Sequence, residues 1–220
     1  MSRLKFQALF LFTVFTLAVM VTPAYSTTIT SYSSSATWLA ATTGVVTTDT
    51  FDGLAPSGTF TTTGTITQNG VQFIGLAGST GIADTSIFPW DNFLTGFAGF
   101  VTNSQNAISV TITLPTPVTA FGLNLFTNPS AATYTVTTLS TPFTVPTFAI
   151  PTPAFFGVTS DTPISTINLS VPAGSTYAFF DNFSFGTAQT QVPEAGTFLL
   201  IGTGLIGFAV FRNKARQPQR

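Results

Sequence analysis

Apolar and hydroxyl-bearing residues alternate along most of the chain between residues 45 and 185. The alternation is most regular over residues 108–114, where every apolar residue is even-numbered and every hydroxyl residue is odd-numbered. A period of two places successive side chains on opposite faces of a strand, so this segment predicts a half-buried strand. Related patterns predict strands at residues 45–51, 59–68, 71–74, 121–125, 134–136, 155–158, 164–171 and 176–185.

Turn-forming residues separate these segments. Asn69-Gly70 is the pair preferred in type I′ turns, so it predicts a tight hairpin leading into residues 71–74. Further turns are expected at Pro115-Thr116-Pro117 and at Ser160-Asp161-Thr162-Pro163. Residues 142–153 contain several prolines and are expected to form an edge strand or a loop, because proline cannot donate to a strand ladder.

Only one segment of the region between residues 27 and 186 predicts a helix. It covers residues 31–43, where a serine N-cap precedes Trp38 and Leu39, and Gly44 ends it. Residues 75–105 are rich in Gly and Asn and are expected to be loops with one or two short strands. Nine or ten short strands separated by turns predict an all-β, antiparallel, jelly-roll-like β-sandwich over residues 27–186.

The two ends of the chain differ from this region. Residues 1–26 have the pattern of a signal peptide: Arg3 and Lys5 precede an apolar core, and small residues precede the expected cleavage site. Ala24 and Ser26 occupy the positions that signal peptidase recognises, so cleavage is expected before Thr27, with cleavage after Ala24 as the other possibility. An uncleaved membrane anchor is the alternative reading.

The C-terminal segment has three parts after a polar linker at residues 187–191. Val192, Pro193 and Glu194 form a short polar turn, and residues 195–211 form an unbroken apolar run. At about 1.5 Å per residue, this run is close to the minimum length of a transmembrane helix. Basic residues follow it and are expected to stay on the cytoplasmic side of the membrane. They are Arg212, Lys214 and Arg216, with a basic tail end at residues 217–220.

The distribution of charged residues excludes several classes of function. The chain has no cysteine and no histidine, and no lysine or arginine lies between Thr27 and Gln191, where six aspartates give a formal charge of −6. A domain without cations cannot release counterions from a phosphate backbone, which excludes nucleic-acid binding. It also has no imidazole base, thiol nucleophile or Schiff-base lysine. The sequence therefore predicts no catalytic residues, and a glycosidase-like pair of aspartates is the remaining enzymatic alternative.

Aspartates and aromatic residues are the two kinds of candidate ligand-binding residue in the domain. Strand alternation places Asp181 on one face with Tyr177, Phe179, Phe183 and Phe185, and a buried carboxylate without a basic partner needs hydrogen-bond donors or a metal. A structural Ca²⁺ site formed by Asp181, Asp52 and Asp91 is therefore one hypothesis, and a solvent-facing Asp181 at a bulge is the other. No other cofactor is expected. Trp90 and Tyr177 could stack on a sugar ring, or could belong to the core.

The C-terminal segment, residues 192–216, resembles the PEP-CTERM class of bacterial sorting signals. The shared features are Val192-Pro193-Glu194, an apolar run containing Gly202, Gly204 and Gly207, and the basic cluster. The third motif position is Ala195, where the pattern has proline. The resemblance implies an exported protein that a membrane exosortase processes, in a Gram-negative bacterium that makes exopolysaccharide.

These features predict a non-enzymatic cell-surface or extracellular-matrix protein. The precursor would be anchored in the inner membrane by its C-terminal helix, with signal peptidase and exosortase as processing partners. A carbohydrate-binding module that recognises exopolysaccharide in a biofilm is the alternative function.

Overall fold

The computed structural model describes residues 27–52, 54–56, 59–75, 80–83, 99–102, 108–128, 130–148, 152–171, 177–189 and 202–206. Residues 202–206 are helical, and they are the only part of the predicted transmembrane run that is described. Among the described residues, no helix is both long enough and apolar enough to span a membrane. The predicted signal peptide, residues 1–26, and the predicted sorting motif, residues 192–194, also lie outside these ranges.

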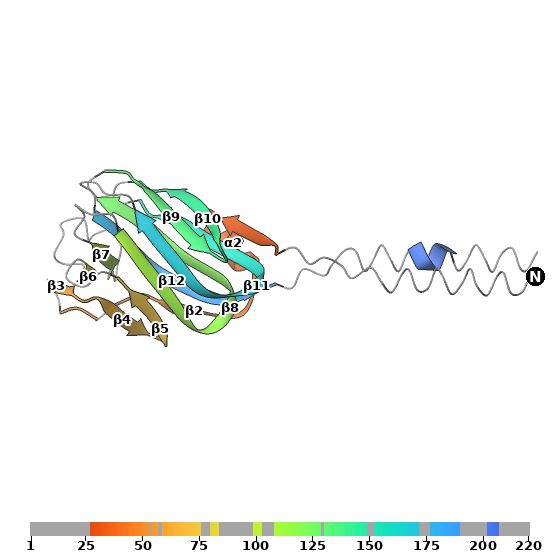
Figure 1. Ribbon diagram of the computed structural model, residues 1–220, viewed down its shortest axis with the longest axis horizontal. Helices are drawn as coiled ribbons and strands as arrows, with labels where there is room; N and C mark the ends of the chain where they lie inside the picture. Colours follow the sequence, from red (N-terminus) through yellow and green to blue (C-terminus); the bar gives the residue numbers. More distant parts are fainter. Residues whose placement is uncertain are drawn as a thin grey trace, which may run out of the picture.

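The domain consists mostly of antiparallel β-strands, as the sequence predicts (Figure 1). Its elements, in chain order, are β1 (Ile29–Tyr32), α2 (Ser35–Ala40), β2 (Thr42–Asp49), β3 (Phe60–Thr62), β4 (Thr65–Gln68), β5 (Val71–Ile74), β6 (Thr80–Ala83), β7 (Gly99–Thr102), β8 (Ile108–Asn128), β9 (Thr133–Thr138), β10 (Thr141–Pro146), β11 (Ala154–Val171) and β12 (Tyr177–Ala188).

Two long strands, β8 and β11, pair with each other along most of their length and belong to both layers of a β-sandwich. The first half of β8 and the second half of β11 lie in a sheet with the order β4-β5-β8-β11-β9-β10, which we call sheet I. The other halves lie in a sheet with the order β1-β11-β8-β12-β2, which we call sheet II. A separate three-stranded sheet, β3-β6-β7, completes the described fold.

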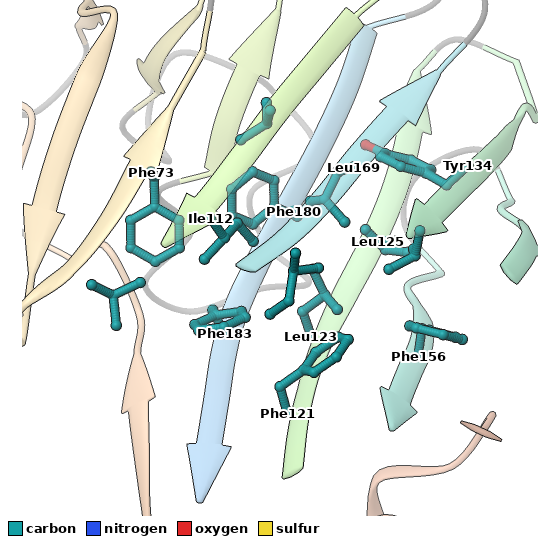
Figure 2. Packing of buried hydrophobic residues seen from close by; sticks show 14 of the residues in the cluster. Phe73, Ile112, Phe121, Leu123, Leu125, Tyr134, Phe156, Leu169, Phe180 and Phe183 are labelled. Carbon is teal, nitrogen blue, oxygen red and sulfur yellow. The ribbon is translucent and has the colours of Figure 1, made fainter. Parts of the chain in front are cut away.

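The core lies between the two sheets. Figure 2 shows side chains from both sheets gathered in it, with Phe73 and Ile112 from sheet I beside Phe180 and Phe183 from sheet II. Phe73 contacts Phe183 edge to face, with ring centroids 5.5 Å apart, a favoured geometry for aromatic pairs. Tyr134 is the polar exception, and its hydroxyl donates to the backbone oxygen of Phe179 at 2.9 Å. The alternating pattern therefore produces one continuous apolar layer.

Two of the predicted turns are instead bends within continuous strands. In β8, the residues of the hydrophobic core are even-numbered up to Leu114 and odd-numbered from Phe121 to Leu125, and the exposed segment Pro115-Thr116-Pro117 lies between them. In β11, the pairing register with β8 shifts between Thr159 and Thr166. Both bends occur where the strands pass from one sheet to the other, so the turn residues mark a change of layer. The prediction of separate strands there was wrong.

Four further predictions about local structure had mixed outcomes. The Asn69-Gly70 hairpin is confirmed, with positive φ at both residues. The helix is real but shorter than predicted, because an additional strand, β1, precedes it and pairs with β11. The single strand predicted at residues 59–68 is two strands in different sheets, β3 and β4. The edge position expected for the proline-rich segment is confirmed for β10, which ends the strand order of sheet I.

Candidate functional site

Asp181 lies in a β-bulge of β12. Asp181 is paired with Asn124 of β8, whereas Ser184 is paired with Gly122, so β12 has one residue more than β8 between these points. Asn182 has a φ of 49°, a conformation that asparagine tolerates better than most residues. The bulge reverses the alternation, because Ala178 and Phe180 belong to the core before it and Phe183 belongs to the core after it. The prediction that Asp181 shares a face with Phe183 and Phe185 was therefore wrong.

Asp181 is nevertheless buried, with only 3% of the residue's surface exposed. It accepts hydrogen bonds from the backbone N–H of Asn182 at 2.6 Å and from the side-chain amide of Asn182 at 3.0 Å. Burial raises the pKa of Asp181 to about 7, the hydrogen bond from Asn182 partly offsets this, and the negative charge of Asp52 adds to the increase. The site thus holds a carboxyl group that titrates near neutral pH.

The other residues of the calcium hypothesis are only partly described. Asp52 is exposed and close enough to Asp181 to repel it electrostatically, while Asp91 lies outside the described residues. Within the described part of the chain, no three acidic side chains gather as metal ligands. The calcium site therefore stays a prediction. Trp90 also lies outside the described residues, and for Tyr177 the structure gives the strand position alone.

Asp49, at the end of β2, is a second buried carboxyl that the sequence did not single out. It is fully buried, and one of its oxygens accepts a hydrogen bond from the side-chain amide of Asn69. The second oxygen has no hydrogen-bond partner among the described residues. Burial raises the pKa of Asp49, and the bond from Asn69 partly offsets the increase. The sequence feature that could have identified Asp49 is its position at the end of a strand of alternating residues.

The exposed face of sheet I is uncharged and mostly polar, and we call its polar side chains the hydroxyl face. Ile74, Pro142 and Pro146 are apolar residues on the same face. The side chains of the hydroxyl face alternate with the core residues of each strand and lie opposite one another across neighbouring strands. Thr111 donates from its hydroxyl to the side-chain oxygen of Asn168 at 2.9 Å across such a pair. The hydroxyl face consists of Thr65, Thr67, Gln72, Ser109, Thr111, Thr113, Thr133, Thr135, Thr137, Thr144, Thr166, Asn168 and Ser170.

Comparison with known proteins identifies the C-terminal segment. Residues 191–214 match the PEP-CTERM protein-sorting motif, which confirms the resemblance seen in the sequence. The match begins two positions after the last residue of the domain that the structure describes, Gln189. No curated protein matches the chain in sequence.

Several solved structures are similar to the β-sandwich domain. One is a variant of CBM29-2, a family 29 carbohydrate binding module, at 13% identity, a TM-score of 0.38, and coverage of 67% of this chain and 99% of that chain. Another is a family 29 carbohydrate binding module, at 12% identity, a TM-score of 0.37, and coverage of 68% of this chain and 95% of that chain. Similarity at this level identifies neither a ligand nor a family.

Proposed function

We propose that this chain, which carries a PEP-CTERM sorting motif at residues 191–214, is an exported, non-enzymatic protein of the cell surface or extracellular matrix. Signal peptidase removes residues 1–26, and the C-terminal helix holds the precursor in the inner membrane of a Gram-negative bacterium. An exosortase then processes the chain at the motif. The motif match is the observation that supports this proposal, together with the lack of any basic residue between Thr27 and Gln191.

The positions of the first and last residues of the sandwich fit a precursor with a signal peptide at one end and a membrane helix at the other. Thr28 is bound to Asp161 through backbone and side-chain hydrogen bonds, and the backbone N–H of Gln189 donates to the oxygen of Ala41 at 2.9 Å. β1 and the end of β12 lie at the same end of the domain (Figure 1). The two points at which the terminal segments join the sandwich therefore lie at the same end of the domain, and that end faces the membrane before processing.

Intact-mass measurement of the protein taken from the cell surface tests this proposal. We expect a mass that lacks both the signal peptide and residues from the C-terminal segment. Deleting residues 192–194 should retain the full C-terminus and leave the protein in the membrane fraction. A surface protein that keeps residues 195–220 would contradict processing and leave a simple membrane anchor.

The hydroxyl face favours a second candidate function, the binding of an uncharged polysaccharide. Its rows of hydroxyl and amide groups carry no charge, so they can exchange hydrogen bonds with sugar hydroxyls without attracting or repelling ions. Each such bond contributes little alone, about 0.5–1.5 kcal/mol net, but an extended chain would make many at once. Exopolysaccharide of the cell's own matrix is the ligand that this candidate implies.

A binding assay on insoluble neutral polysaccharide tests the second candidate, using the processed protein from the cell surface. Replacing Thr111 and Thr135 by valine keeps the strand propensity and removes two hydroxyls from the hydroxyl face, so we expect several-fold weaker retention. Thr116→Val, at the exposed bend of β8, is the matched control and should bind normally. Equal losses in both variants, or no retention of the native protein, would rule out this face as a binding surface.

A further inference from the structure

Asp161 binds the backbone where the mature domain is expected to begin. Both of its carboxylate oxygens accept the backbone N–H of Thr28 at 3.0 Å, and its own N–H donates to the oxygen of Thr28 at 3.2 Å. The hydroxyl of Thr162 donates to Asp161 at 3.1 Å and is within hydrogen-bond distance of the hydroxyl of Thr27, at 3.2 Å. Thr27 and Thr28 are thus held against the bend of β11.

The domain between Thr27 and Gln191 offers this carboxylate no basic side chain. No lysine, arginine or histidine lies between Thr27 and Gln191, and the hydrogen bond from Thr28 holds the pKa of Asp161 below its usual value. Asp161 is therefore an exposed anion throughout the neutral range. A positive charge formed nearby would have no competing basic partner within the domain.

Removal of residues 1–26 would create such a charge. The nitrogen of Thr27 is separated from that of Thr28 by only three backbone bonds, so the two atoms lie within about 3.6 Å of each other. We propose that Asp161 is the binding site for the α-ammonium group that cleavage after Ser26 creates on Thr27. This inference rests on the proposed export and processing of the chain.

Cleavage would give the domain its only cation, and the pairing of this cation with Asp161 would fasten β1 to β11. β1 has four residues and pairs with β11 from Ile29↔Ser160 to Tyr32↔Gly157, directly beyond this contact. Cleavage after Ala24 would instead place the ammonium group two residues further from Asp161. The choice between the two possible cleavage positions therefore has a structural consequence.

Titration of the α-amine in chains with defined first residues tests the proposal. A chain from Thr27 to Arg220 in detergent, which lacks only the signal peptide, is compared with a chain that begins at Tyr25. We expect the α-amine of the Thr27 chain to have a pKa about half a unit above the ordinary 7.7–8.0, as suits an exposed ion pair. The Tyr25 chain and an Asp161→Asn variant of the Thr27 chain should titrate normally, whereas an Asp52→Asn control should keep the increase.

An ordinary pKa in the Thr27 chain, or an increase that persists in Asp161→Asn, would overturn the proposal. The N-terminal sequence of the exported protein provides a separate result. Cleavage at any position other than the Ser26–Thr27 bond would also overturn it, even if export is correct. Retention of residues 1–26 would instead refute the proposed export, and the titration would still report whether the pair can form.

Discussion

Substituting alanine for Gly157 is expected to lower the free energy of unfolding by about 1–3 kcal/mol, the range for overfilling a packed site. A β-carbon added at Gly157 would lie 2.7 Å from Cδ1 and 2.8 Å from Cγ of Trp38. It would also lie 2.9 Å from a ring carbon of Phe155. Contacts this short force the two aromatic rings to move.

The indole ring has little freedom to move away. Trp38 is 2% exposed, and its ring N–H donates to the backbone oxygen of Val158 at 3.1 Å. Gly157 is paired with Gly122 of β8, where an added β-carbon would lie 2.7 Å from the ring of Phe155. The two opposed glycines form a flat platform on sheet II, and Trp38 and Phe155 lie over it. Shifting Trp38 would also break its hydrogen bond.

Denaturant unfolding of the mature chain, followed by tryptophan fluorescence, measures this effect. Gly186→Ala is the matched control, because Gly186 is also in a strand but its added β-carbon would meet nothing closer than 3.4 Å. The control should change stability by less than about 1 kcal/mol, since alanine also restricts the unfolded chain. Equal effects of the two substitutions would show that the platform does not require glycine.

The glycine platform illustrates what the sequence could and could not predict. A short helix that carries Trp38 and Leu39 is expected to pack both side chains on a sheet, and this expectation is confirmed for Trp38 but wrong for Leu39, which is half exposed. The pairing of Gly122 with Gly157 depends on the register of two strands far apart in the chain. A single sequence contains no direct record of that register. The Asn69-Gly70 hairpin was predictable because its turn and both its strands are local.

The same reasoning explains the errors at the bends and at Asp181. Proline and aspartate favour chain reversal locally, but at residues 115–117 and 160–163 the pairing of β8 with β11 keeps both strands continuous. At Asp181, strict alternation predicted one face, whereas the extra residue at Asn182 changes the phase. Asn182 was the available signal, since asparagine is enriched at positive φ. The sorting motif was predictable because its three parts are contiguous.

The stability of the domain is expected to fall as the pH rises from about 4 to about 7. The pKa of Asp181 is about 7 in the folded chain, compared with a reference value of 3.8 for the unfolded one. Between these values the folded state holds a proton that the unfolded state has lost, so each increase in pH favours unfolding. The stabilising contribution is fully present below the unfolded pKa and is lost as the pH rises through the folded pKa. Its size is up to roughly 4 kcal/mol.

Denaturant unfolding at pH 4.5 and pH 7.5 measures this change. Asp181→Asn should remove most of the decrease, because the amide cannot ionise in the buried bulge. Asp49 contributes in the same direction, since burial raises its pKa as well, so a smaller decrease should remain until Asp49 is also replaced by asparagine. Asp161→Asn is the control, because the pKa of Asp161 is lowered and its contribution is lost as the pH falls. An unchanged slope in Asp181→Asn would contradict the assignment.

The same variant decides the calcium hypothesis. At pH 7.5 the carboxylate of Asp181 is largely ionised, buried and repelled by Asp52, and a bound cation would relieve both costs. If Ca²⁺ binds there, millimolar calcium should raise the melting temperature at pH 7.5 more than at pH 4.5, where the proton competes for the site. Asp181→Asn should abolish the calcium effect at both values. A melting temperature of the native chain that calcium does not change would leave Asp181 as a proton-binding group without a metal.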